Sequence, residues 1–162
     1  MDFKDLKVAK TELKIQKITS PSNNPKAKVA YNCEVGIPTR SDLKMGGETW
    51  TEWYLFYTSA GLRTCCVKNN NGWWIFGGSS NEEADYVSIR GTNVALYYNG
   101  PQGNFNLFFP SVFTERSRDA VASYTIDYFS GAPFVGQYIW QGGTGASKCI
   151  YGPYTVECAF GI

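Results

Sequence analysis

The stretch Thr49–Gly78, TWTEWYLFYTSAGLRTCCVKNNNGWWIFGG, carries the strongest secondary-structure signal in the chain. It is rich in aromatic and β-branched residues, which favour strands, and it holds four of the five tryptophans. Asn71-Gly72 separates two apolar runs, and an Asn-Gly pair in that position is typical of a two-residue hairpin turn because both residues need a positive φ. We therefore expect antiparallel strands here, with one strand over Thr49–Thr58 that Ala60-Gly61 ends.

Short apolar runs punctuated by Gly, Pro and Asn continue on both sides of this stretch. About ten or eleven strands are expected from this spacing. The pattern predicts an all-β fold, namely an antiparallel β-sandwich of the jelly-roll or galectin-like kind or a related one. A degenerate β-trefoil or a barrel is the alternative. At most one or two helical turns are expected, and Ser111–Ala122 is the best internal candidate, with Ser111 as its cap.

The length of 162 residues favours a single domain spanning 1–162. Within it, residues 1–19 are expected to form an N-terminal arm or a short helix. No run approaches the roughly 18 apolar residues of a membrane span, and the charged start Met1–Asp5 is not that of a signal peptide. These features indicate a soluble protein, secreted or cytoplasmic, whose compartment the sequence leaves open.

The net charge of +1 offers no bulk attraction for nucleic acid, so no nucleic-acid partner is predicted. The charge is unevenly placed, because residues 1–28 carry a net +4 and the remainder a net −3. The basic segment is interpreted as a solvated arm, with contact to a membrane or a polyanion as the lesser alternative.

Cysteine and histidine usage excludes several kinds of site. The chain has no histidine, and its five cysteines form no C-x-x-C pair, so His-dependent nucleophiles and His-ligated metals are ruled out. We predict no metal and no cofactor. Cys149 and Cys158 flank a turn and either form a disulfide or remain buried thiols. A Cys65–Cys66 bond is disfavoured because neighbouring side chains on a strand point to opposite faces.

Catalysis by paired carboxylates is also disfavoured. Glu48 and Glu52 are the pair nearest the aromatic stretch, but residues four apart on a strand lie about 13 Å apart, beyond the separations that glycosidases use. The chain is therefore not predicted to be an enzyme.

Adjacent aromatic pairs recur along the predicted strands. Because strand neighbours point to opposite faces, such strands carry large rings on both sides. Three explanations remain open: the fold covers both faces, a second subunit covers one, or the outer rings form a ligand platform. The pairs are Trp53-Tyr54, Phe56-Tyr57, Trp73-Trp74, Tyr97-Tyr98, Phe108-Phe109 and Tyr128-Phe129.

Loops that mix aromatics with amides suit carbohydrates, since a sugar stacks its C–H face on a ring and bonds its hydroxyls to amides. The sequence therefore predicts a lectin-like, carbohydrate-binding homo-oligomer whose partners are glycans. The two main candidate loops are Asn69–Trp74, with Ser79–Asn81 after it, and Tyr97–Asn104, and Tyr138–Gly143 is a weaker third. Turns whose Asn and Gly serve only the backbone are the structural alternative. The predicted ligand-binding residues are Asn71, Trp73, Trp74, Tyr98, Asn99 and Asn104.

Two other functions stay open at this point. The aromatic residues would also suit a membrane interface, as in a pore-forming or membrane-binding β-sandwich toxin. The chain could equally be the receptor-binding head of a larger viral or phage assembly.

Overall fold

The computed structural model describes residues 32–70, 79–129 and 134–162. Within these ranges the chain is built from strands and turns. The described residues contain no helix, and therefore none long and apolar enough to cross a membrane. The strands are β1 (Cys33–Ile37), β2 (Arg40–Trp53), β3 (Tyr57–Asn69), β4 (Ser79–Asn81), β5 (Ala84–Gly100), β6 (Gly103–Asp119), β7 (Val121–Phe129), β8 (Gln137–Tyr151) and β9 (Tyr154–Gly161).

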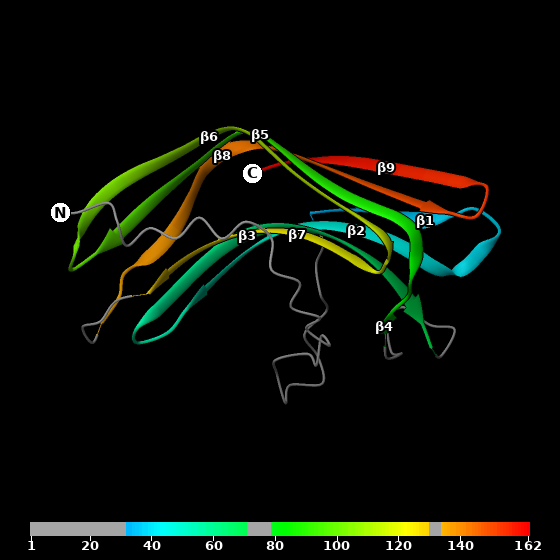
Figure 1. Cartoon of the computed structure of the whole chain (residues 1–162), viewed down its shortest axis with the longest axis horizontal. Coiled ribbons are helices and arrows are strands. Elements are labelled where there is room, and N and C mark those ends of the chain that lie inside the picture. Colours follow the sequence, from blue (N-terminus) through cyan, green and yellow to red (C-terminus); the bar gives the residue numbers. More distant parts are fainter. Residues whose placement is uncertain (1–31, 71–78, 130–133) are drawn as a thin grey trace.

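The strands form two antiparallel sheets that pack face to face as a β-sandwich (Figure 1). Sheet A has the order β1-β2-β3, and both β7 and β4 pair with the remaining edge of β3. Sheet B has the order β6-β5-β8-β9. The predicted all-β sandwich is confirmed, and in the described part of the chain the sheets do not close into a barrel.

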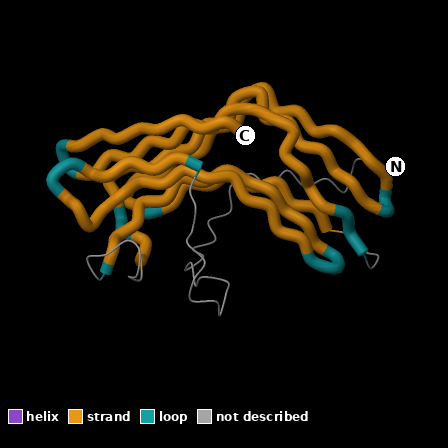
Figure 2. The backbone as a smooth tube through the Cα atoms, turned by 180° about the vertical axis from the view of Figure 1, so that it is seen from behind, coloured by secondary structure: helices purple, strands orange, loops and turns teal. Residues whose placement is uncertain are grey.

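The turns gather at the two ends of the sandwich (Figure 2). At one end, the Tyr54 end, Val135 N donates to Leu55 O at 2.9 Å and Gln102 Nε2 donates to Phe134 O at 2.8 Å. These bonds bring together the β2–β3 turn, the β5–β6 turn and the segment before β8. The other end is the Thr39 end, where the β1–β2 and β8–β9 turns meet.

Sheet B is bent, and its side chains change face at the bend. In β5, Ile89 and Leu96 both lie in the core although seven positions separate them, an odd number that strict alternation would not allow. Asn93 lies between them with a φ of 52°, in the left-handed region that Asn tolerates. In β8, Gly142 and Gly143 also have positive φ where the β5–β8 register shifts. The resulting arch is visible in Figures 1 and 2.

The core fills the space between the sheets in two clusters. The larger cluster contains Leu62 and Val87, and the smaller one, toward the Tyr54 end, contains Tyr98 and Ile126. A buried polar contact also crosses the core, because the Thr64 hydroxyl lies 2.8 Å from both Ser88 O and Ser147 Oγ.

The helix predicted over 111–122 is wrong, because Ser111 to Asp119 belong to β6. Their burial alternates as in a strand, with Val112 and Thr114 buried and Phe113 exposed. Strand β5 supplies the hydrogen-bonded partner along the whole length of this segment, which outweighs the weak helical signal.

The single strand expected from Thr49 to Thr58 is also wrong. The chain turns back after Trp53, and Tyr54 N donates to Tyr57 O at 2.7 Å to close that turn. Ala60-Gly61 then lies inside β3 and breaks nothing. The predicted turn at Asn71-Gly72 and the arm at 1–19 lie outside the described residues.

The disulfide joins Cys33 to Cys158, with a Cα–Cα distance of 6.1 Å. The Cys149–Cys158 bond considered from the sequence is wrong, because Val156 lies opposite Cys149 in the β8–β9 ladder. Cys149 is a buried thiol, as are Cys65 and Cys66. The bond therefore connects the β1 edge of sheet A to the β9 edge of sheet B.

Candidate ligand-binding face at the uncharged end

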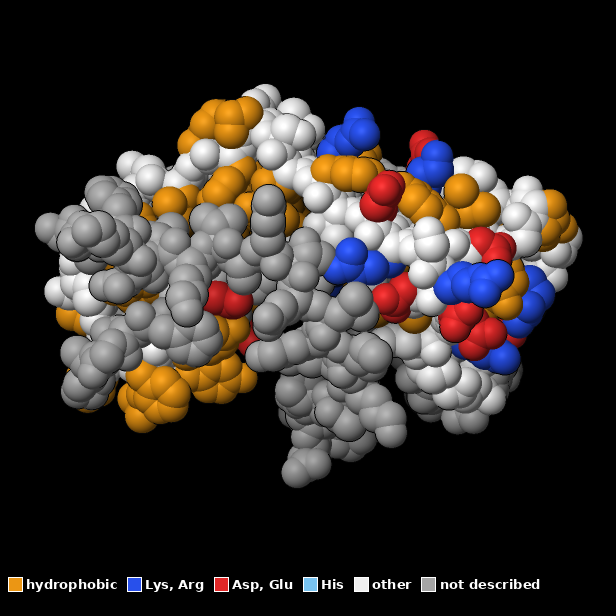
Figure 3. All heavy atoms as spheres, in the orientation of Figure 1, with side chains coloured by type: hydrophobic (Ala, Val, Ile, Leu, Met, Phe, Trp, Pro, Cys, Tyr) orange, Lys and Arg blue, Asp and Glu red, His pale blue; other side chains and the backbone are white. Residues whose placement is uncertain are grey.

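Charged residues are segregated along the length of the sandwich. Residues 53–62, 93–114 and 134–147 extend from the Tyr54 end toward the middle of the sandwich, and none of them is charged. Glu52 and Asp127 lie beside these stretches. Most other described charges lie toward the Thr39 end, where Figure 3 shows red and blue side chains gathered on the right. The Tyr54 end is therefore suited to neutral ligands.

A row of three amides crosses the outer face of sheet B at this end. In the ladders of β5, Asn99 lies opposite Asn104 of β6 on one side and opposite Gln137 of β8 on the other. All three residues are exposed. Since Tyr98 points into the core, its neighbour Asn99 points outward. Three strands thus place three amide groups side by side on one surface.

The next outward row places an aromatic ring beside these amides. Tyr97 of β5 lies between Asn106 of β6 and Ile139 of β8. Tyr97 is half-buried, whereas Asn106 and Ile139 are exposed. One row further on, Phe108 lies opposite Ala95 and is 61% exposed. We call this surface the amide face; its residues are Tyr97, Asn99, Asn104, Asn106, Phe108, Gln137 and Ile139.

The amide face combines the two groups that neutral polar ligands need. Each amide offers an oxygen acceptor and two N–H donors, so four amides can bond a set of neighbouring hydroxyls. The Tyr97 and Phe108 rings offer apolar surface for C–H groups. No ionisable acid or base other than the Tyr97 hydroxyl lies on this face, which favours binding over proton-transfer chemistry.

The predicted binding residues have different outcomes. Asn99 and Asn104 lie on the amide face, next to each other across β5 and β6. Asn71, Trp73 and Trp74 lie outside the described residues. Of the weaker segment 138–143, Ile139 contributes to the face.

The assignment of Tyr98 as an outward ligand residue is wrong. Its side chain is fully buried, at 0% exposure, and its hydroxyl donates to Gln102 Oε1 at 2.7 Å. Gly136 N donates to the same hydroxyl at 2.8 Å. Continuing the alternation of Val87 and Ile89 would put Tyr98 outside, but the left-handed Asn93 shifts the alternation by one position.

The candidate loop Tyr97–Asn104 included Tyr97, but Tyr98 was chosen as the binding residue in its place, and Asn106 and Gln137 were not predicted. Alternation within β5 would have found Tyr97 only if the reversal at Asn93 had been recognised. Asn106 and Gln137 join the face through pairing with β5 across a turn and across a long connection, respectively. Such pairings depend on the register of separate strands, for which the local sequence carries little signal.

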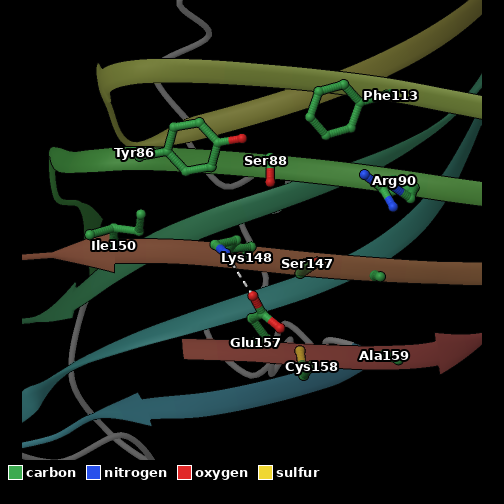
Figure 4. Close-up of a pocket in the computed structure, with 11 residues that line it drawn as sticks. Tyr86, Ser88, Arg90, Phe113, Ser147, Lys148, Ile150, Glu157, Cys158 and Ala159 are labelled. Carbon is green, nitrogen blue, oxygen red and sulfur yellow. Dashed lines mark ion pairs between the residues drawn. The ribbon is translucent and has the colours of Figure 1, made fainter. Parts of the chain in front are cut away.

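A second surface feature is a groove on the outer face of sheet B toward the Thr39 end (Figure 4). Its volume of about 680 Å³ would admit a small molecule. Its polar groups already bind one another, because Lys148 pairs with Glu157 at 2.8 Å and the Tyr86 hydroxyl donates to Glu115 at 2.7 Å. Arg90 stacks over the Phe113 ring. A ligand here would have to displace these contacts, so the amide face is the better candidate.

Two groups that catalysis could use, Glu48 and Cys65, are buried. Glu48 is buried and forms an ion pair with Arg63. Burial raises the pKa of the Cys65 thiol to about 12, which keeps it protonated rather than nucleophilic at neutral pH. Among the described residues, no cluster of acidic or cysteine side chains could hold a metal ion.

Comparison with known proteins identifies no relative: no family model matches the chain, and no curated protein or solved structure is significantly similar to it.

Proposed function

We propose that the chain is a non-enzymatic carbohydrate-binding module whose amide face holds a neutral glycan. The observation that supports this most directly is the row Asn104–Asn99–Gln137 beside the Tyr97 ring, which β6, β5 and β8 place on one exposed surface. Sugar hydroxyls would bond to the amides while a C–H face packs on Tyr97 or Phe108.

The absence of charge on this face narrows the class of glycan. Sialylated or sulfated sugars are anionic, and proteins bind such groups with Arg or Lys. Residues 93–114 and 134–147 contain neither. The proposal is therefore for neutral hexose- or N-acetylhexosamine-type glycans. A single shallow site binds weakly, so a homo-oligomer that presents several sites would raise the avidity.

A glycan array tests this proposal, with Tyr97→Ala and Asn99→Ala as variants. The wild type is expected to bind neutral glycans in preference to anionic ones. Each variant should lose about tenfold in affinity, because one ring or one amide is worth on the order of 1 kcal/mol or more. Phe113→Ala is the matched control, since Phe113 is an exposed ring on the same sheet but outside the amide face.

Absence of glycan binding by the folded wild type would reject the proposal, as would binding that both variants retain. Light scattering tests the homo-oligomer separately, and a single species at the chain mass of 18.0 kDa would reject it.

A further inference from the structure

Among the described residues, five large apolar side chains project from the Tyr54 end with more than half of their surface exposed. Trp53, Tyr54, Leu55 and Phe56 form the β2–β3 turn, and Phe134 lies beside them; each is between 55% and 62% exposed. We call this group the aromatic tip. Apolar side chains also stand out at the lower left of Figure 3, at the end where Figure 1 places the β2–β3 turn. Contiguous exposed apolar surface of this kind marks a contact site.

Several polar groups of the aromatic tip are bonded within the protein. The Trp53 indole N–H donates to Val135 O at 2.7 Å, Val135 N donates to Leu55 O, and Tyr54 N donates to Tyr57 O. Phe134 O accepts from Gln102 Nε2. A hydrocarbon environment offers no hydrogen-bond partners, so a segment can enter it only when its own polar groups are already satisfied. The aromatic tip meets this condition at these positions.

The positions of the nearest charges set the depth to which the tip could enter a bilayer. Glu52 and Asp127 lie at one level, because both are opposite Ser59 in the sheet A ladders. Strand β2 ends one residue beyond Glu52, at Trp53, about 3.4 Å farther along the strand. The turn residues Tyr54, Leu55 and Phe56 lie beyond that point. Amphipathic surfaces enter the interfacial region by about 5–10 Å. At that depth the rings are buried while both carboxylates stay among the headgroups.

The same two carboxylates select the kind of membrane. Glu52 and Asp127 would be repelled by an anionic lipid surface, and no lysine or arginine lies in the uncharged stretches that extend from this end. A zwitterionic headgroup such as phosphocholine carries no net charge and offers an ammonium group to the carboxylates. Trp and Tyr rings are also enriched at this level of a bilayer.

A second protein suits the aromatic tip less well than a bilayer. Five side chains slightly more than half exposed present on the order of 500 Å², whereas a specific interface needs about 800 Å² on each partner. A bilayer requires no such minimum area, because each apolar side chain that leaves water contributes independently to binding. From the rings, the internal hydrogen bonds and the charge pattern we infer that the aromatic tip inserts into the interface of a zwitterionic lipid bilayer.

Vesicle flotation of the full chain tests this inference, with pure phosphatidylcholine vesicles that carry no glycan. We expect binding that persists at high salt, because it is apolar rather than electrostatic. The double variant Leu55→Ala/Phe56→Ala should weaken partitioning about 100-fold, since each side chain contributes roughly a tenfold factor or more. Neither side chain donates a hydrogen bond, so the fold is expected to survive. Phe113→Ala is the control and should bind within about twofold of the wild type.

Each of the following results would overturn the inference. One is no flotation with phosphatidylcholine, and another is flotation that the double variant retains. The third is binding only to anionic vesicles that salt abolishes, which would point to the lysines of residues 1–28. A dimer that the double variant dissociates would make the tip a protein interface instead. Glycan binding is tested independently, so either proposal can fail while the other stands.

Discussion

Cys33 and Cys158 are bonded across the sandwich, and their disulfide closes a loop of 125 residues between the edge strands of the two sheets. Cys33 lies on β1 and Cys158 lies on β9. Both are short strands that pair with only part of the neighbouring strand. The bond thus secures the one edge where both sheets end in short strands.

Loss of this disulfide should destabilise the protein strongly. The double variant Cys33→Ser/Cys158→Ser is expected to lose about 3–5 kcal/mol of unfolding free energy, because a long loop is no longer closed in the unfolded chain. Urea denaturation with and without reductant measures it. Reductant should lower the unfolding free energy of the wild type to that of the double variant and should leave the unfolding free energy of the variant unchanged. A wild type indifferent to reductant would contradict the assignment, as would more than the three free thiols on titration of the unfolded, unreduced chain.

Thr64→Val removes the buried hydroxyl that links the sheets. Ser147 Oγ and Ser88 O would each lose a partner in the core, and we expect a cost of about 1–3 kcal/mol in unfolding free energy. Thr155→Val is the matched control on an exposed position of β9 and should stay within about 0.5 kcal/mol of the wild type. Equal effects at the two positions, measured by urea denaturation, would show that the hydroxyl contact contributes nothing.

Gly61→Ala should also destabilise the fold, through overpacking. A Cβ atom at Gly61 would lie 2.7 Å from the Trp50 ring and 2.6 Å from Tyr124 O. Such crowding costs about 1–3 kcal/mol. Gly36→Ala is the control, because nothing lies within 4 Å of its Cβ position. Thermal melts should show a lower Tm for Gly61→Ala alone, and a Tm as high as that of Gly36→Ala would refute the close packing of Trp50 on β3.

Alkaline pH should destabilise the protein through Tyr57. Burial, together with the hydrogen bond that its hydroxyl donates to Asp127, raises the pKa of Tyr57 to about 12. The unfolded chain releases this proton near its ordinary pKa of about 10. The native state binds the proton more tightly, so its stabilising effect is complete below about pH 10 and is lost as the pH rises toward 12.

Urea midpoints measured between about pH 9 and 11 test this sign. The wild type should lose stability more steeply with pH than Tyr57→Phe, which lacks the proton. Other buried tyrosines, such as Tyr138 with its pKa raised by burial, are common to both proteins and cancel in the comparison. Parallel slopes would mean that Tyr57 titrates normally in the folded state.

The class of fold was accessible from the sequence because its signals are local. Dense β-branched and aromatic residues, broken by Gly, Pro and Asn, predict strands wherever they occur. The same local signals misplaced features that depend on pairing. The local sequence of Ser111 to Asp119 favours a helix, but pairing with β5 makes the segment a strand. The turn after Trp53 contains no Gly or Pro, so the local sequence does not predict it.

Two of the predicted binding residues, Asn99 and Asn104, lie on the candidate face. They could be predicted because the turn Asn99-Gly100-Pro101 is recognisable from the local sequence. Their partners were not accessible in the same way. Gln137 reaches Asn99 through a pairing across 38 positions of sequence, and Tyr97 replaces Tyr98 because of the left-handed turn of the backbone at Asn93.

Composition and local pattern thus determined the all-β character of this chain, its lack of histidine chemistry and the uncharged stretches that extend from one end. The strand register, the bend of sheet B and the Cys33–Cys158 bond were settled by tertiary packing. The physical reason is that a one-residue change of register or alternation turns every later side chain to the opposite face. Which of two adjacent tyrosines meets solvent is therefore a property of the folded sheet.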